Sequence, residues 1–176
     1  LAQLATVTDR ISIGTSIVPV YARTPANLAM TALNMDIMSK GRFFLGLGSS
    51  GKLGIEDFHG EKFEKPLSRM REYINFVRMA LRGDRLDLEG KFFSTKRFRL
   101  RFTPYRETLP IFIASLTPLS LQMTGEIADG WLPIYYSPGR MAPSYDKLKS
   151  GAQITGRSLS DITVSPQVSI YVTKDK

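Results

Sequence analysis

The segment from Asp36 to Gly51, DIMSKGRFFLGLGSSG, constrains the fold of this chain more than any other stretch. Gly41 suits the left-handed conformation that ends a helix, and Lys40 places a cation at the helix C-terminus. The apolar run 43–47 is typical of a strand buried on both faces. Residues 48–51 then leave that strand with little side-chain bulk. Because α/β proteins bind ligands where parallel strands end, the segment predicts a site as well as a fold.

The rest of the chain alternates between short apolar segments and segments with helical periodicity. Strands are expected at residues 11–18, 42–47, 111–114, 131–135 and 162–173, and helices at 1–7, 25–38, 66–81, 118–128 and 145–153. A long polar loop is expected at 48–65, and the alternation around Glu89-Gly90 predicts a β-hairpin near residues 85–100. Strand–helix alternation implies an α/β fold with a parallel sheet and right-handed crossovers.

The length of 176 residues suits one domain covering residues 1–176. The chain has no cysteine, which excludes disulfides and thiolate chemistry and fits a cytoplasmic protein. No apolar run reaches the roughly 18 residues of a membrane span. The N-terminus, LAQLATVTDR, has neither a starting Met nor the layout of a signal peptide. We therefore expect the chain to begin inside a larger protein.

The formal net charge is +8, which raises the possibility of a nucleic-acid partner. The basic residues cluster in the segment 91–106, KFFSTKRFRLRFTPYR, and alternate there with aromatic residues. Such a mixture can bind single strands by charge and stacking. We favour an edge hairpin kept soluble by its cations, because the rest of the chain lacks nucleic-acid motifs. A third interpretation is an anion funnel for a phosphorylated cofactor or an acidic substrate.

Four stretches, in this order, carry a family resemblance: GTSIVPVYARTP (14–25), DIMSKGRFFLGLG (36–48), PLSRMREY (66–73) and PIFIASLTPLSLQMTGEIADGWL (110–132). Together they resemble the bacterial luciferase-like superfamily of flavin and deazaflavin oxidoreductases. The branch that uses coenzyme F420, such as methylenetetrahydromethanopterin reductase, is the most similar. The resemblance implies a partial (β/α)8 TIM barrel that supplies about strands three to seven, with the hairpin as an insertion. Open sheet edges would expose apolar surface, so we expect a homo-oligomer.

The resemblance also implies where a cofactor binds. The first full strand would end in a bulge with a non-prolyl cis peptide bond between Ser16 and Ile17, pressed against the central ring of the coenzyme. An ordinary strand end is the alternative. Gly48 and Ser49 match the next exit loop of the family. This stretch would therefore form the ring-binding part of the site.

A second group of residues is implied to bind the cofactor phosphate. Ser115, Leu116 and Thr117 follow an apolar strand at a place where the family often has glycines. Their backbone and hydroxyl groups, with the next helix N-terminus, would favour an anion. The alternative is that Thr117 only caps that helix. Gly139 and Arg140 lie in a further exit loop and form a second phosphate candidate.

Catalytic residues are less well specified. Several relatives carry an Asp or Glu where this chain has Gly51, and that carboxylate is placed for proton transfer. Glu56 and His59 of the same loop are weak substitutes, as are Lys52 and Asp57, although a lone histidine is more often structural.

Three further charged residues have expected roles. Arg23 is expected to meet either an anionic group or a surface ion-pair partner, Glu72 to form an ion pair, and Asp129 to be structural.

The leading functional hypothesis is hydride transfer between C5 of the deazaflavin F420 and a carbon of a small-molecule substrate. One alternative is an FMN-dependent monooxygenase that uses molecular oxygen. Another is a non-catalytic truncated fragment that self-associates. No metal site is predicted, and neither a membrane nor a nucleic acid is expected as a partner.

Overall fold

The computed structural model describes residues 1–135, 137, 139 and 141–173. They form two compact units, Leu1–Ile113 and Ala114–Lys176. Both units contain parallel strands connected through helices, so the chain has the α/β fold that the alternating pattern predicted. The expectation of a single domain stays a prediction.

Strand β3 (Phe43–Gly48) is the centre of the first unit. It pairs in parallel with β1 (Ile13–Gly14), β2 (Val18–Pro19) and β6 (Ile111–Ile113). The strand predicted at 11–18 is therefore two short strands, with residues 15–17 between them.

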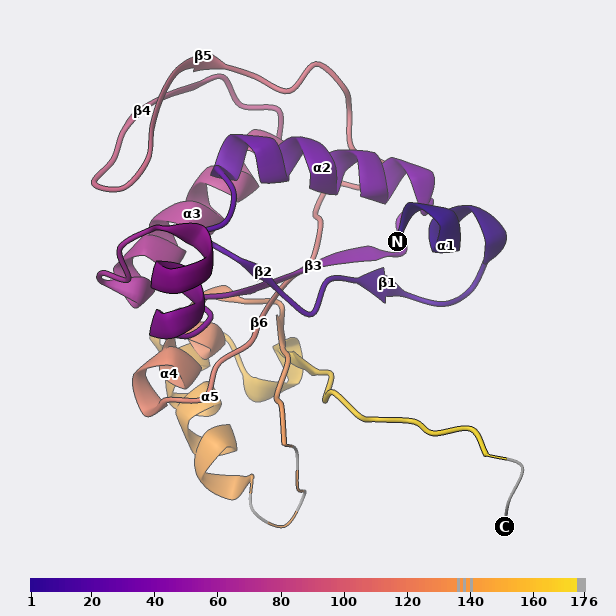
Figure 1. The fold of residues 1–176 in the computed structure, drawn as a ribbon, viewed down its shortest axis with the longest axis vertical. Helices are drawn as coiled ribbons and strands as arrows, with labels where there is room; N and C mark the ends of the chain where they lie inside the picture. Colours follow the sequence, from indigo (N-terminus) through magenta and orange to yellow (C-terminus); the bar gives the residue numbers. More distant parts are fainter. Residues whose placement is uncertain (136, 138, 140, 174–176) are drawn as a thin grey trace. The chain divides into compact units, whose positions relative to one another are not determined.

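Three helices accompany these strands: α1 (Ala2–Val7), α2 (Pro25–Met38) and α3 (Pro66–Leu81). Thr24 caps α2 as predicted, because its hydroxyl accepts a hydrogen bond from the Asn27 N–H and Pro25 takes the first helical position. Lys40 and Gly41 both adopt left-handed backbone, with φ of 54° and 79°, and so turn the chain into β3. Helix α2 lies along one side of β1–β3 and packs on β3 and α3 (Figure 1).

Alternate residues of β3 face different surroundings. Phe43, Leu45 and Leu47 are fully buried, which confirms the predicted buried strand. Phe44 instead stacks on Phe112 of β6, with ring centroids 4.6 Å apart. A Cβ atom on Gly14 would collide with the Phe44 ring, so only glycine fits at that position of β1.

The basic segment forms the predicted hairpin, from β4 (Leu86–Glu89) and β5 (Ser94–Phe98), which pair antiparallel. Its aromatic side chains point to α3: Phe93 packs edge-on against Tyr73 at 5.3 Å, and Phe98 lies 5.8 Å from Phe76. These two rings are packed within the protein, whereas Phe102 and Tyr105 of the basic segment are exposed. The hairpin is therefore confirmed, and the absence of a nucleic-acid partner stays a prediction.

The loop predicted at 48–65 contains a helical segment that the sequence analysis missed. Residues Gly54–Phe58 form a π-helix, η1, around the fully buried side chain of Ile55. Leu53 and Phe58 beside it are exposed, so one buried apolar side chain gives no helical period, which is why the pattern indicated only a loop.

The second unit contains α4 (Pro118–Ile127), β7 (Gly130–Trp131), α5 (Ala142–Ile154), η3 (Leu159–Asp161) and β8 (Thr163–Val164). Strands β7 and β8 pair in parallel, and the Trp131 ring packs against Leu148 and Ile162. Helices α4 and α5 touch backbone to backbone, since a Cβ on Gly125 would collide with the Leu148 carbonyl and one on Gly151 with the Gln122 carbonyl.

Two strand predictions in this unit were too long, and one helix prediction was too short. The strand expected at 131–135 ends at Trp131, and the one expected at 162–173 ends at Val164. The helix expected at 145–153 already begins at Ala142. Side chains from Val168 to Val172 are exposed, so this stretch has strand-like composition without burial.

Within the described ranges, no helix combines the length and the apolar character needed to cross a bilayer.

Candidate functional site

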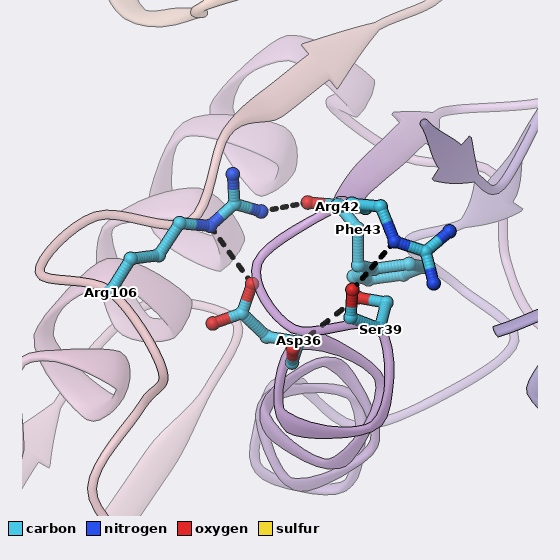
Figure 2. A network of polar contacts seen from close by, with 5 residues as sticks. All are labelled: Asp36, Ser39, Arg42, Phe43 and Arg106. Carbon is cyan, nitrogen blue, oxygen red and sulfur yellow. Dashed lines mark hydrogen bonds and ion pairs between the residues drawn. The ribbon is translucent and has the colours of Figure 1, made fainter. Parts of the chain in front are cut away.

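The start of β3 is held by a buried charge. Asp36, at the end of α2, is fully buried, and its carboxylate accepts a 2.8 Å hydrogen bond from Nε of Arg106. The same guanidinium donates through Nη2 to the carbonyl of Phe43, the first residue of β3 (Figure 2). Ser39 closes the turn by donating to the Asp36 carbonyl at 3.2 Å. This network fixes where β3 begins.

Arg42 extends the network towards α1. Its guanidinium donates to the carbonyl of Ser39 at 2.8 Å, as Figure 2 shows. It also bonds the Thr8 hydroxyl at 3.0 Å and the carbonyls of Ala5, Thr8 and Ile11 at 2.7–2.9 Å. Four of these five hydrogen bonds hold α1 and the α1–β1 connection against the start of β3, and the fifth holds the turn at Ser39.

The other end of β3 is held by a threonine hydroxyl and not by charged side chains. Thr15 lies between β1 and β2, and its hydroxyl donates to the Gly46 carbonyl at 2.8 Å and accepts from the Gly46 N–H at 2.9 Å. This side chain replaces the backbone groups that a regular strand would pair there. The next peptide bond, Ser16-Ile17, is cis, as the resemblance implied.

Pairing resumes directly after the bulge. Val18 and Pro19 lie beside Leu47 and Gly48, and the Val20 N–H donates to the Gly48 carbonyl at 3.0 Å. Ser16 is exposed, while Gly48 is buried in the strand end. The structure therefore brings the Ser16-Ile17 bulge and the Gly48–Ser49 exit together, at the C-terminal ends of adjacent parallel strands.

The catalytic candidates, among them Glu56 and His59, lie in the exit loop of β3. The Glu56 carboxylate accepts a 3.3 Å hydrogen bond from the Phe63 N–H and lies 3.8 Å from the Lys52 ammonium. Both contacts stabilise the loop itself. His59 is exposed at the end of η1. A catalytic role for either residue stays a prediction.

The phosphate candidates in the second unit are engaged in local contacts. Ser115 is buried; its hydroxyl lies 2.8 Å from that of Thr124, and its carbonyl accepts from Nε1 of Trp131 at 3.0 Å. Thr117 forms a reciprocal capping box with Ser120 at the start of α4, so the predicted capping is present.

The remaining phosphate candidates are more open. Leu116 is 63% exposed. Among the described residues, and apart from its own chain neighbours, no heavy atom lies within 4 Å of the position a Cβ on Gly139 would take. Arg140 lies outside the described residues.

Two buried tyrosines line the β2–α2 connection of the first unit. Tyr73 donates to the carbonyl of Arg23 at 3.2 Å, and Tyr21 donates to the carbonyl of Glu64 at 2.9 Å. Burial raises the pKa of both phenols above the ordinary value, with the Arg69 charge acting in the opposite direction in each case. Both therefore stay protonated hydrogen-bond donors near neutral pH.

Glu72 has a role that the sequence analysis missed. Its carboxylate accepts hydrogen bonds from the N–H groups of Lys91, Phe92 and Phe93, at 3.1, 2.9 and 2.7 Å. A Cβ on Gly90 would collide with this carboxylate. Glu72 thus fixes the hairpin turn on α3. The helical pattern around Glu72 gives no signal for this role, because the turn lies about 20 residues away in the sequence.

Comparison with known proteins agrees with this geometry. The family model described as luciferase-like monooxygenase matches residues 1–176. A Mycobacterium tuberculosis protein, provisionally named a coenzyme F420-dependent oxidoreductase, is 38% identical over 100% of this chain and 55% of its own length. The 5,10-methylenetetrahydromethanopterin reductase of Archaeoglobus fulgidus is 30% identical over 100% of this chain and 52% of its own length.

A solved structure shares the fold. The coenzyme F420-dependent tetrahydromethanopterin reductase from Methanopyrus kandleri superposes with a TM-score of 0.86 at 27% identity, over 94% of this chain and 52% of that one. The match confirms the predicted partial TIM barrel. The chain spans about half the length of the relatives it matches. It belongs to the luciferase-like monooxygenase family.

Proposed function

We propose that this chain is the coenzyme-binding part of an F420-dependent oxidoreductase. The observation that carries the proposal is the one-residue bulge between β1 and β2, which directly precedes the pairing of Val18 and Pro19 with Leu47 and Gly48 at the C-terminal end of β3. The relatives named above add support, because two of the three carry F420 in their names. When bound, reduced F420 supplies a hydride from C5 of its deazaflavin to a carbon of the substrate.

The residues of the bulge fit a flat, uncharged ring. Ser16, Ile17, Gly48 and Ser49 carry no charge, and Gly48 has no side chain to keep a ligand away from the backbone. The two hydrogen bonds between Thr15 and Gly46 hold the bulge in place. In this proposal Ser16 and Ile17 support one face of the ring and leave the opposite face to the substrate.

A phosphate-binding role is proposed for the start of α4, within the second unit taken by itself. The N-terminus of α4 favours an anion, and Leu116 and Thr117 immediately precede it. Because the Ser115 hydroxyl bonds Thr124, contact at this residue would come from its backbone. Gly139 and Arg140 remain the second proposed phosphate contact.

The proposal also includes a proton donor and a class of substrate. Gly51 offers no acid, so Glu56 or His59 would have to hold the proton from the same loop. The substrate is proposed to be a small organic molecule with an oxidisable or reducible carbon.

Fluorescence titration of the chain with F420 and separately with FMN tests the proposal. We expect saturable binding of F420 and weaker binding of FMN. Tighter FMN binding would favour the FMN-dependent monooxygenase that the family name suggests. No binding of either cofactor by a folded chain would favour the self-associating, non-catalytic fragment.

A charge placed at the phosphate site sharpens this titration. Leu116→Asp introduces an anion at an exposed position, so we expect F420 binding to weaken about tenfold by like-charge repulsion. Val168→Asp, at a 67% exposed position after β8, is the matched control and should leave binding unchanged. Equal effects of the two variants would argue against a phosphate contact at Leu116.

Self-association is a separate proposal. Leu4, Val7 and Ile11 are exposed apolar side chains around α1. Such a surface favours a covering partner, for which we propose a second copy of the chain. Sedimentation analysis is expected to show an oligomer that Val7→Asp weakens, and a wild-type monomer would contradict the proposal.

A further inference from the structure

A short segment of the first unit lies between two neighbouring hollows. This segment, residues 99–102, follows β5 and runs beside α2 (Figure 1). It lines one hollow of about 400 Å³ together with the end of α3, and another of about 270 Å³ together with α2. Ligand pockets in proteins commonly hold about 300–1,000 Å³, so the two hollows have room for one small molecule.

The larger hollow is the arginine hollow, lined by Arg82, Arg99 and Arg101. Two of these side chains are oriented by contacts that leave part of each guanidinium group free. Arg82 pairs with Asp84 at 3.0 Å, and Nε of Arg99 donates to the Gly83 carbonyl at 3.2 Å. The same contacts engage the carboxylate and the carbonyl that would otherwise repel an anion at the end of α3.

Arg101 brings a positive charge that is not neutralised within the described part of the chain. Its side chain is exposed, and among the described residues it has neither an ion pair nor a hydrogen bond. The Nη groups of Arg99 also have no partner among those residues. Because arginine binds phosphate oxygens through paired N–H groups, the arginine hollow suits a phosphate or diphosphate group.

The smaller hollow is the apolar hollow. Met30, Leu33 and Asn34 share one side of α2 and line this hollow together with Leu100 and Phe102. Phe102 is 69% exposed, so its ring has surface available for stacking. The Asn34 carboxamide offers both a donor and an acceptor, which suits the edge of a nucleobase.

We propose that the two hollows form a binding site for a nucleoside diphosphate. The diphosphate would bind Arg99 and Arg101 in the arginine hollow, and the base would stack on Phe102 in the apolar hollow. A ligand with both parts is favoured because residues 99–102 line both hollows. A simple anion would leave the apolar hollow unused, and an uncharged ring would leave the arginines unused.

This site is separate from the proposed coenzyme site. Pro66, the first residue of α3, follows the exit loop of β3, whereas Arg82 follows the last residue of that helix. The 16 residues of α3 span about 24 Å, so the end of the exit loop and the arginine hollow lie at opposite ends of the helix. Nucleotide binding should therefore not compete with F420.

Calorimetric titration of the chain with ADP, inorganic pyrophosphate and adenosine tests the site, at constant ionic strength and without coenzyme. We expect saturable binding of ADP and at least about tenfold weaker binding of the other two, because each of them fills only one hollow. No saturable binding of ADP, or equally tight binding of pyrophosphate, would overturn the proposal. An oligoadenylate that binds more tightly than ADP would also overturn it, since the groove would then hold single-stranded nucleic acid.

Two variants at exposed positions separate the two parts of the ligand. Arg101→Gln should weaken binding of ADP and pyrophosphate about tenfold, and Phe102→Ala should weaken binding of ADP about tenfold without changing that of pyrophosphate. Arg97→Gln and Phe58→Ala change exposed residues outside both hollows and should bind ADP like the wild type. Equal losses in a variant and its control would contradict the site, provided that circular dichroism shows each variant folded.

A titration with F420 in the presence of saturating ADP tests whether the two sites are separate. We expect the affinity for F420 to be the same with and without ADP, and displacement of either ligand by the other would contradict separate sites. Because the ADP titrations contain no coenzyme, a chain that fails to bind F420 would leave their result unaffected.

Discussion

The two ends of β3 are held by different kinds of side chain. At its start, the buried Asp36 carboxylate, the Arg106 guanidinium and the five hydrogen bonds of Arg42 lock the strand to its neighbours. At its end, Gly48 and Ser49 leave the sheet beside a bulge that is held by one threonine hydroxyl.

The difference separates stability from function. In β/α barrels, the N-terminal ends of the strands serve stability, and the C-terminal ends carry the active site. Side-chain charge is therefore concentrated where no ligand is expected, while the ligand-binding end keeps small residues and a hydroxyl. The predictions below test this division, from the largest expected effect to the smallest.

Arg106→Ala should cause the largest loss of stability. Removing the guanidinium leaves the fully buried Asp36 carboxylate without its partner, which costs about 3–5 kcal/mol of unfolding free energy. Urea denaturation measures the change. Arg82→Ala is the control, because Arg82 and Asp84 form an exposed pair, also about 3 Å apart, expected to contribute about 0–1 kcal/mol. Equal losses of unfolding free energy in the two variants would show that the Arg106–Asp36 pair stabilises the protein no more than an exposed ion pair.

Thr15→Val should have an intermediate effect at the other end. The substitution keeps the shape of the side chain but leaves the N–H and carbonyl of Gly46 without their partner, which costs about 1–3 kcal/mol. Thr6→Val, which removes only an exposed hydrogen bond to Gln3, is the control in the same denaturation experiment. A loss below that of Thr6→Val would show that the hydroxyl does not hold the bulge.

Tyr73→Phe should change how stability depends on pH. Burial raises the pKa of Tyr73 in the folded state, so the unfolded chain loses this proton first, at about pH 10. The unfolding free energy therefore falls as pH rises above about 10, by up to about 1.4 kcal/mol per pH unit for this group. The phenylalanine variant should lack that part of the fall between pH 9 and 11, whereas Tyr171→Phe, at an exposed position, should keep it. Identical pH profiles of the wild type and Tyr73→Phe would contradict the assignment.

Gly51→Ala should have the smallest effect. In the described structure, no heavy atom other than those of the chain neighbours lies within 4 Å of the added Cβ, and the backbone of Gly51 is not left-handed. The change should therefore stay within about 0.5 kcal/mol or be slightly stabilising. Denaturation would detect a larger loss, which would mean that the exit loop is tightly packed.

Local signals predicted much of this fold. Thr24-Pro25, Gly41 and Gly83 mark helix boundaries through caps and left-handed turns, and the structure places α2 and α3 at the predicted positions. Such signals act within a few residues of the chain, so one sequence is sufficient to find them. The bounds of β3 followed from the same reasoning, because an apolar run between Gly41 and Gly48 marks a strand without reference to its partners.

Other features depend on residues that are far apart in sequence. Arg106 reaches Asp36 across 70 positions, and Glu72 reaches the hairpin turn across about 20, so neither contact leaves a local pattern. The composition of 162–173 favours a strand, but the strand ends at Val164, and the backbone bonds of Ser165 and Gln167 to Trp131 and Pro133 continue only a short way beyond it. The residues of the coenzyme site came from the resemblance to a family, since a glycine exit loop alone does not identify a ligand.

The affinity of two variants for F420 tests the central division most directly. Gly48→Ala adds a methyl group at the ligand-binding end, and Arg106→Lys weakens the network at the other end while keeping its charge. We predict that Gly48→Ala weakens F420 binding at least about tenfold while the protein stays folded, and that folded Arg106→Lys binds F420 like the wild type. Unchanged binding by Gly48→Ala together with lost binding by folded Arg106→Lys would contradict the account.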